Sequence, residues 1–285
     1  MKNIMDYKNL IKLCTQVRRD ILRMVYLANS GHPGGSMGCT EYFVALYKVI
    51  MNYDTKNFQI EGKNEDLFFL SNGHISPVYY SILSRCNFFP LKELNSFRKI
   101  NSRLQGHPTP YEGLPGIRIS SGSLGQGMSV AIGAALAKKL NGESTVIYSL
   151  HGDGELNEGQ IWEAVLYAGA KKIDNYIATI DNNGQQIDGT TDEVLNLGNI
   201  KEKFESFGWF VLEEKKGNKL INVINVLKNA KKFINKKKPI LIILKTKMGY
   251  GVDFMSKDNS WHGKAPSFEE LQKALIQLPQ TLEDF

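Results

Sequence analysis

TVIYSLHGDGELNEGQIWEAVLYAGAKKIDNYIATIDNNG, residues 145–184, consists of two apolar runs separated by a helical pattern. The first run ends near the tripeptide Gly-Asp-Gly at 152–154, and the second ends before Asp-Asn-Asn at 181–183. Each run is typical of a parallel strand that is buried on both faces. Residues 158–169 predict the helix that crosses from one strand to the next. Since such crossovers are right-handed, both strands are expected to end at the same edge of the sheet.

Asp153 and Asn183 follow these two strands and are therefore expected to face the same point. A carboxylate and an amide oxygen are hard ligands suited to Mg²⁺, which fills its remaining positions with water and phosphate oxygens. The pair therefore implies a bound diphosphate. The alternative is an ordinary α/β turn in which Asp153 caps a helix.

The composition is that of a soluble globular protein. The chain has 285 residues, 42% of them hydrophobic, and a net charge of +6 from scattered lysines. Basic residues do not alternate with aromatic ones, so we expect no nucleic-acid partner. The longest aliphatic run, 240–244, is too short to span a membrane, and the first residues do not resemble a secretory signal. Cys14, Cys39 and Cys86 show no paired spacing and fit reduced thiols, so we expect a cytoplasmic protein with no membrane partner.

Helical and strand patterns alternate along the whole chain. Helices are expected over the first thirty residues, 41–51, 77–86, 91–99, 127–140, 158–169 and 219–233. Strands are expected at 66–70, 117–121, 145–150, 176–180, 210–212 and 239–245. This alternation predicts the α/β class, with a doubly wound parallel sheet flanked by helices. No linker or internal repeat interrupts it, so a single domain, 1–285, is the simplest expectation.

The loops after the expected strands are polar or glycine-rich, as a phosphate site requires. The chain has five histidines, of which most occur in such loops: His32, His74, His107, His151 and His262. A lone histidine in a loop is more often a surface or structural residue, but several in the same setting favour a site. They are too dispersed for a structural zinc site. Neutral imidazoles beside a diphosphate would suit proton transfer on a sugar.

Six motifs in matching order resemble the transketolase family. They are Ser30-Gly31-His32-Pro33-Gly34, Ser71-Asn72-Gly73-His74, Gln105-Gly106-His107-Pro108, the loop 121–127, the Gly-Asp-Gly…Asn-Asn run, and Trp261-His262-Gly263-Lys264-Ala265-Pro266. The resemblance covers essentially the whole chain, yet only the thiamine diphosphate-binding part of that family. The pyrimidine-binding and C-terminal domains with which the family continues have no counterpart in these residues. The chain thus looks like the N-terminal subunit of a split transketolase, with a thiamine diphosphate-binding fold.

The resemblance also implies a metal site and a cofactor site. Mg²⁺, for which Ca²⁺ or Mn²⁺ can substitute, would be held by Asp153, Asn183 and the main-chain carbonyl of Gln185. Gly154 would offer its N–H to the diphosphate, and Ile187 would pack near the thiazolium. The implied cofactor-binding residues are His74, Gly122, Ser123, Leu124, Gly154, Asn183, Ile187 and His262. Ser123 stands where many relatives have proline.

The catalytic residues implied by the resemblance are His32, His107, His262 and Glu158. The three histidines would contact the donor sugar and move its protons. Glu158 would belong to an acidic network that joins paired cofactor sites. Its alternative role is that of a carboxylate favoured by the helix dipole at the start of a helix.

The function implied by the resemblance is the transfer of a two-carbon ketol unit from a ketose phosphate, such as xylulose 5-phosphate, to an aldose phosphate, such as ribose 5-phosphate, in the pentose phosphate pathway. The enzyme would need thiamine diphosphate and Mg²⁺. It would be active only with a complementary C-terminal subunit that carries the pyrimidine-binding domain, in an α2β2 heterotetramer.

Three alternatives remain open. The chain could instead belong to a related thiamine diphosphate enzyme, namely 1-deoxyxylulose-5-phosphate synthase, dihydroxyacetone synthase or the E1 α subunit of a 2-oxoacid dehydrogenase, although the Gly31–Gly34 and Gly106–Pro108 loops favour a sugar ketol-transferase. It could also be a non-catalytic scaffold that binds Mg²⁺ and a diphosphate. A dinucleotide-binding domain is disfavoured, because the glycines at 122, 125 and 127 have the wrong order for that fingerprint.

Overall fold

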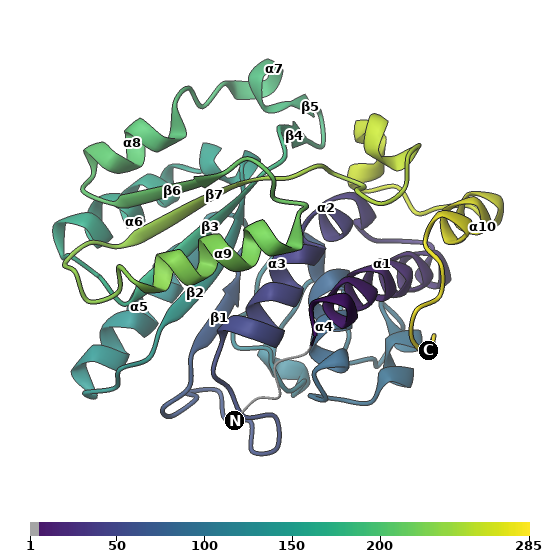
Figure 1. Cartoon of the computed structure of the whole chain (residues 1–285), viewed down its shortest axis with the longest axis horizontal. Helices are drawn as coiled ribbons and strands as arrows, with labels where there is room; N and C mark the ends of the chain where they lie inside the picture. Colours follow the sequence, from purple (N-terminus) through teal and green to yellow (C-terminus); the bar gives the residue numbers. More distant parts are fainter. Residues whose placement is uncertain (1–5) are drawn as a thin grey trace.

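Five parallel strands form the central sheet of the computed structural model, which describes residues 6–285 (Figure 1). Their order across the sheet is β1-β2-β3-β7-β6. The strands are β1 (Leu67–Leu70), β2 (Ile147–Gly152), β3 (Tyr176–Asn182), β6 (Phe210–Glu214) and β7 (Ile240–Lys245). The pairing places Gly152 beside Asp181, and Asn182 beside Lys245, so the ends of three neighbouring strands coincide. The predicted doubly wound parallel sheet is confirmed.

Helices cover both faces of this sheet (Figure 1). One face carries α1 (Tyr7–Ala28), α2 (Pro33–Gly38), α3 (Thr40–Ala45), α4 (Ser76–Arg85) and α9 (Leu220–Lys231), with α10 (Phe268–Gln277) against α1. The other face carries α5 (Gln126–Leu140), α6 (Gly159–Ala170) and α8 (Ile200–Ser206). The first five residues of β7 are all apolar because the strand is buried on both faces. Ile240, Ile242 and Leu244 enter the first core, whereas Leu241 and Ile243 enter the second.

Short elements extend the main ones. A hairpin of β4 (Gln185–Gln186) and β5 (Gly189–Thr190) follows β3 and leads into α7 (Thr191–Leu195). A π-helical turn, Leu46–Ile50, continues α3. Short 3₁₀ turns occur at Gly73–Ile75, Leu91–Ser96, Pro110–Glu112, Gly154–Asn157, Met255–Lys257 and Asn259–His262.

Two predicted elements were wrong in kind. Residues 117–121 are not a strand: the Ile117 N–H donates to Leu114, and the Arg118 side chain reaches outward to Glu65 and to the carbonyl of Ile60. The segment is thereby held by the 59–65 loop rather than by a neighbouring strand. Residues 91–99 form only the 3₁₀ turn Leu91–Ser96. The beginning of the first predicted helix, residues 1–5, lies outside the described part of the chain.

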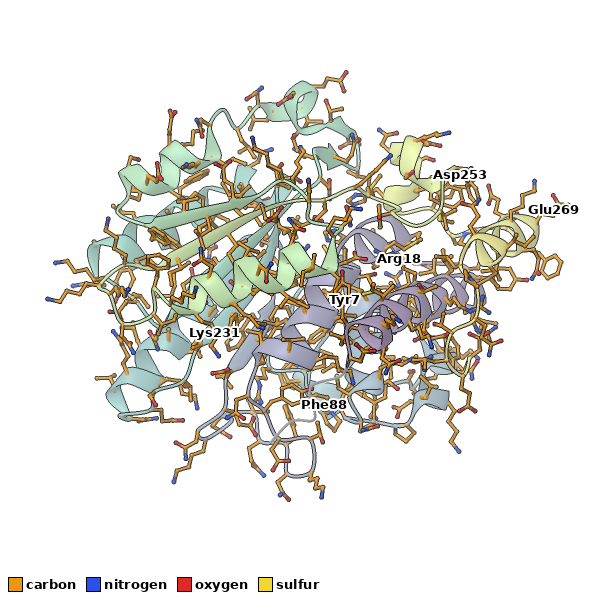
Figure 2. All side chains as sticks on the ribbon, in the orientation of Figure 1. Tyr7, Arg18, Phe88, Lys231, Asp253 and Glu269 are labelled. Atoms are coloured by element: carbon orange, nitrogen blue, oxygen red, sulfur yellow. The ribbon has the colours of Figure 1, made fainter. Side chains whose placement is uncertain are left out.

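Helix α1 is joined to α3 by a buried ion pair and to the loop that follows β7 by a cation–π contact. Arg18 of α1, labelled in Figure 2, donates to Glu41 of α3 at 2.6–2.7 Å, and its guanidinium lies over the ring of Tyr250. Asn218, ahead of α9, donates to the Gly38 carbonyl at 2.8 Å and accepts from the Lys247 N–H at 2.7 Å. These contacts fix the chain that leads from β7 to His262.

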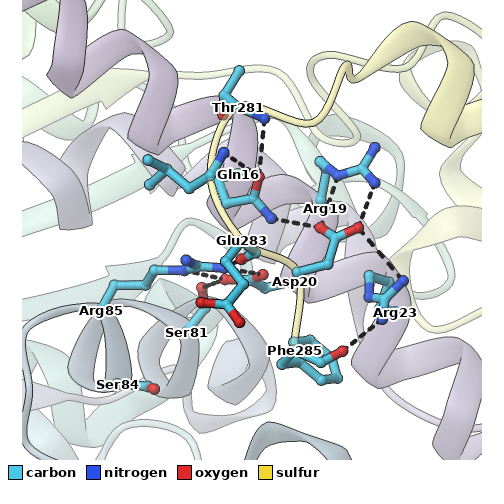
Figure 3. A network of polar contacts seen from close by, with 12 residues as sticks. Gln16, Arg19, Asp20, Arg23, Ser81, Ser84, Arg85, Thr281, Glu283 and Phe285 are labelled. Atoms are coloured by element: carbon cyan, nitrogen blue, oxygen red, sulfur yellow. Dashed lines mark hydrogen bonds and ion pairs between the residues drawn. The ribbon is translucent and has the colours of Figure 1, made fainter. Parts of the chain in front are cut away.

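The last residues of the chain lie against α1 (Figure 3). Arg19 donates two hydrogen bonds to the carboxylate of Asp284, at 3.0 and 2.6 Å, and Gln16 donates a third at 2.6 Å. Arg23 donates to the carbonyl of Phe285 at 2.6 Å. The tail therefore adds a polar layer to a helix whose opposite side is in the core.

Two expectations from composition can be compared with the structure. Cys14, Cys39 and Cys86 are free thiols and are buried, as predicted. None of the helices within residues 6–285 combines the length and the apolar character needed to cross a membrane.

Candidate active site

A cavity of about 600 Å³ lies at the carboxyl edge of the sheet. Residues from widely separated parts of the sequence line it. The predicted site residues among them are His32, His74, Gly122, Leu124, Asp153, Gly154, Glu158, Asn183, Gln185, Ile187 and His262. Two predicted residues are not part of this lining: His107 lies with its ring 6.4 Å from that of His32, and Ser123 is exposed between Gly122 and Leu124. Asp153 and Asn183 thus line the same cavity, as the crossover argument predicted, and the other motifs reach it as well.

Asp153 is buried at the inner end of this cavity, with 2% of its surface exposed. Its carboxylate accepts the N–H of Gly154 at 2.8 Å and the N–H of Gly184 at 2.6 Å. Burial and the negative charge of nearby Asp181 raise the pKa of Asp153 to about 7. A carboxylate in this setting favours a bound cation, because a cation would offset both the desolvation and the repulsion.

Asn183 is oriented by its neighbours. Its amide nitrogen donates to Asp181 at 2.9 Å, while its amide oxygen accepts the Gln185 N–H at 2.9 Å. Asp181 is itself buried and accepts a hydrogen bond from Thr246 on the loop after β7. Residues 6–285 contain no cluster of three or more histidine, cysteine, aspartate or glutamate side chains suited to a metal. Asp153 and Asn183 line the same cavity, and their oxygen donors suit an ion that takes its other ligands from phosphate and water, as Mg²⁺ does.

The walls of the cavity contain polar atoms that lack a partner. Asn72 Oδ1, Asn157 Oδ1, Gln186 Nε2 and His32 Nδ1 are buried, and no hydrogen bond to any of them is found within the described chain. Buried polar atoms without partners are costly, so a polar ligand that pairs with them would be stabilised here. Asn157 and Gln186 were not predicted from the sequence.

Four imidazole rings gather at one side of the cavity. His32 lies 5.2 Å from His74 and 5.6 Å from His262, between ring centroids, and His74 stacks on His262 at 5.2 Å. His107 packs against Gly122, whose φ of +130° and lack of a Cβ leave room for the ring. The three motifs and the closing histidine segment therefore meet at one point.

Burial keeps these histidines neutral. It lowers the pKa of His32 to about 4, with further lowering by the charges of His262, Arg98 and His107. The pKa values of His74 and His262 are also lowered, mainly by burial. That of His107, at the rim, is lowered by partial burial and by Arg98. Neutral imidazoles can accept protons at physiological pH, which suits general base chemistry.

Arg98 was not predicted to belong to the site. It has a left-handed backbone, with φ of +58°, and donates to the Ser30 hydroxyl at 2.7 Å. Gly106 packs directly against its guanidinium. It therefore links the loops that carry His32 and His107.

Glu158 and Gly154 both line the cavity. Glu158 is exposed at the start of α6, where its side chain makes no capping hydrogen bond, and it lines the cavity. The Gly154 N–H donates to Asp153 rather than toward the cavity. The side chain of Gln186 packs closely on Gly154, so a Cβ at this position would require that side chain to move.

Glu155 was not predicted to be a site residue, and His151 was given no predicted role. Glu155 lines the cavity and is buried, and it accepts hydrogen bonds from Ser71, Gly125 and Gly152. Burial raises its pKa, but the nearby imidazole of His151 and the hydrogen bonds from Ser71 and Gly125 outweigh that effect, so the net pKa is lowered. His151 is fully buried beneath the loop, with Nδ1 3.6 Å from Glu155 and Nε2 2.7 Å from Ser149. Its position is structural and it does not line the cavity.

Comparison with known proteins identifies the same architecture. Residues 11–279 match the family model described as "Transketolase, thiamine diphosphate binding domain". The chain is 34% identical to a subunit of the apulose-4-phosphate transketolase from Phocaeicola vulgatus, over 93% of this chain and 92% of the relative. It is 35% identical to a subunit of the 6-deoxy-6-sulfo-D-fructose transketolase from a Clostridium species, over 91% and 92%.

A solved structure gives the same result. The transketolase of Campylobacter jejuni superposes with a TM-score of 0.88 at 32% identity, over 96% of this chain. That alignment spans only 43% of the Campylobacter chain, and the alignment with the Pichia stipitis enzyme spans 42%. Sequence family, fold and the geometry of the cavity agree, and the chain belongs to the transketolase family, as its thiamine diphosphate-binding domain.

Proposed function

We propose that this chain is the N-terminal subunit of a split, Mg²⁺-dependent transketolase, and that a second, complementary subunit completes its active site in the cytoplasm. The observation that carries the proposal is the cavity at the sheet edge, where Asp153 and Asn183 face the same space as the histidine cluster. Thiamine diphosphate, when bound, supplies the electron sink for breaking and making a carbon–carbon bond beside a ketose carbonyl.

The metal side and the sugar side of the cavity have separate residues. Asp153, Asn183 and the carbonyl of Gln185 would hold Mg²⁺, and the Mg²⁺ would bind the diphosphate. The unpartnered amide groups of Asn157 and Gln186 would offer further hydrogen bonds to the cofactor. His32, His107 and His262 would bind the sugar hydroxyls and accept or return their protons as neutral imidazoles.

The need for a partner is supported by the mouth of the cavity. Ile187, Val194 and Leu195 line it with 68%, 43% and 58% of their surfaces exposed. Apolar side chains at the rim of a polar cavity are suited to cover by another protein surface. Relatives of matching length are named as individual subunits of transketolases, which implies a second polypeptide for them. For this chain we propose a complementary subunit with the pyrimidine-binding domain, in an α2β2 assembly.

The sugar substrates belong to the class of ketose and aldose phosphates or their analogues. Xylulose 5-phosphate and ribose 5-phosphate are the first pair to test. Relatives are named for apulose 4-phosphate and for 6-deoxy-6-sulfo-D-fructose, so we include both as donors.

The test is an assay of the chain mixed with its complementary subunit, with thiamine diphosphate and Mg²⁺. Each donor is offered with ribose 5-phosphate, and the ketose product is quantified. Cofactor-dependent transfer supports the proposal. Decarboxylation of a 2-oxoacid without ketol transfer would assign the chain to another class of thiamine enzyme. Cofactor binding without turnover on any substrate would favour a scaffold.

A further inference from the structure

Glu155, which directly follows the Gly-Asp-Gly tripeptide, is a buried carboxylate that forms no ion pair with any described lysine or arginine. Only 2% of its surface is exposed. The basic group that comes within salt-bridge range is the imidazole of His151, at 3.6 Å. Burying a carboxylate in this way is costly unless hydrogen bonds satisfy it.

The hydrogen bonds that satisfy Glu155 come from three different segments. Oε1 accepts from the hydroxyl of Ser71 and from the Gly125 N–H at 2.9 Å. Oε2 accepts from the Gly152 N–H at 3.1 Å. The Ser71 hydroxyl in turn accepts the Gly127 N–H at 3.2 Å. One carboxylate therefore connects the end of β1, the start of α5 and the end of β2.

Each connected segment leads directly into the cavity. Ser71 precedes Asn72 and His74, Gly125 follows Gly122 and Leu124, and Gly152 precedes Asp153. The backbone pairing of β1 with β2 extends to the Ser71 N–H, which donates to the Leu150 carbonyl, and residues 122–127 belong to no strand of the sheet. The side chain of Glu155 thus fixes their relative positions where the strands no longer do.

We propose that Glu155 is a positioning residue: its carboxylate holds the 71–74, 122–127 and 152–154 loops in the arrangement that accepts thiamine diphosphate and Mg²⁺ before either binds. The proposal rests on the function proposed above. It is specific to a carboxylate, because three donors from separate loops converge on two acceptor oxygens.

Glu155→Gln is the sharpest test variant, because the amide has the same shape but one acceptor fewer. If the amide nitrogen takes the place of Oε2, it faces the Gly152 N–H. If it takes the place of Oε1, it can donate to Ser71 but faces the Gly125 N–H. Either orientation leaves one glycine N–H opposed to another donor, so at least one loop is released.

Asp66→Asn is the matched control. Asp66 is also buried, at the opposite end of β1, and accepts the Asn52 N–H at 3.0 Å and the Val146 N–H at 2.8 Å. Its amide variant likewise leaves one backbone N–H opposed to a donor, but far from the cavity. Ser71→Ala, which removes a single contact of Glu155, serves as a milder second variant if Glu155→Gln does not fold.

Three measurements are made on each variant: melting temperature, amide hydrogen exchange of the chain without cofactor, and affinity for thiamine diphosphate with MgCl₂ in the reconstituted complex. We expect the melting temperature to fall by a similar amount in both amide variants. Only Glu155→Gln should speed exchange in peptides covering 71–75, 122–128 and 151–156. Its cofactor affinity should fall about 10- to 100-fold, as for other residues that support a ligand site, whereas Asp66→Asn should keep its affinity.

The possible results distinguish a failure of the positioning role from a failure of the proposed function. The positioning role is overturned if Glu155→Gln keeps wild-type exchange in these loops, or if Asp66→Asn weakens cofactor binding as strongly, since that would show a general effect of stability. If even the wild-type complex binds no thiamine diphosphate, the proposed function fails. The exchange comparison on the free chain still decides whether Glu155 holds the loops.

Discussion

His32 and His107 are the residues whose proposed role on the sugar differs most clearly from the proposed role of Asp153 in holding the metal. Their rings lie 6.4 Å apart between centroids, within the histidine cluster, and both have lowered pKa values. We expect His32→Ala and His107→Ala to lower turnover of the reconstituted enzyme by about a hundred- to ten-thousand-fold, as for a lost general acid or base. Cofactor affinity should stay near that of wild type.

The check is turnover and thiamine diphosphate affinity measured on the same preparations. Loss of the cofactor by either variant, as complete as that of an Asp153 variant, would show that its assignment to the sugar side is wrong. Full turnover in both would require the sugar site to be redrawn.

The lowered pKa of His32 also predicts a pH dependence of stability. The folded-state pKa, about 4, lies below the ordinary histidine value of about 6.5, so the unfolded chain binds this proton first as the pH falls. Stability is therefore lost between about pH 6.5 and about pH 4. With allowance for solvent screening, wild type should lose about 1–2 kcal/mol more than His32→Gln between pH 7.5 and pH 5.

Urea unfolding of both proteins at the two pH values measures this difference directly. The measurements at pH 7.5 are the control, because the wild-type His32 imidazole is then neutral in both the folded and the unfolded state. Parallel loss of stability in the two proteins would mean that His32 titrates normally in the fold.

Among single residues, those that belong to short glycine-rich motifs could be predicted from the sequence. His32, His74, Asp153, Asn183 and His262 all reach the cavity. The sequence did not predict Asn157, Gln186 or Glu155, whose importance comes from burial and from partners distant in sequence. Nothing in the sequence marks the glutamate after Gly-Asp-Gly, because the backbone N–H groups that donate to it are brought to it only by the fold.

Among the elements, α1 has the most direct test, because its outer side is tied to the last residues of the chain (Figure 3). Asp284→Asn replaces a carboxylate that accepts from Arg19 and Gln16. The Arg19 side chain is 9% exposed, and that of Asp284 is 19% exposed. We expect a loss of about 1–2 kcal/mol in the free energy of unfolding, more than for a fully exposed ion pair.

Denaturant unfolding gives this value, and cofactor affinity is the internal control, since the tail is remote from the cavity. A stability equal to wild type would show that the tail contacts contribute nothing to the fold. A parallel loss of cofactor affinity would show that α1 transmits tail contacts to His32.

The strands were predictable because they are buried on both faces. The prediction at 176–180 lies within β3, and that at 239–245 covers all of β7. The hairpin after β3 was missed because each of its strands has two residues. Helices α7 and α10 were also missed, although both begin with a capping box, at Thr190–Glu193 and Ser267–Glu270, which is a readable signal. The 117–121 error arose because two isoleucines in a short segment imitate a strand.

For the whole molecule, the apolar rim of the cavity and the partial match to longer enzymes lead to a prediction about the activity of the chain when it is purified without a partner. We expect the purified chain alone to have negligible ketol transfer, because in the proposed split arrangement another polypeptide supplies the surface that covers Ile187 and Leu195. Adding the complementary subunit should restore turnover in proportion to the complex formed, as followed by size-exclusion chromatography with a coupled assay. Robust turnover by the chain alone would exclude the split arrangement.

The central claim is that the Asp153 edge of this cavity holds thiamine diphosphate through Mg²⁺. It is tested most directly by calorimetric titration of thiamine diphosphate into the reconstituted complex, for wild type and Asp153→Asn, with Mg²⁺ or with a chelator. Because Asp153 is the one charged ligand proposed for the ion, we predict wild-type binding that depends on Mg²⁺. We predict that Asp153→Asn loses more affinity than the roughly 10- to 100-fold typical of residues that only support a metal ligand. Equal affinity in the variant, or wild-type binding unaffected by the chelator, would contradict the account.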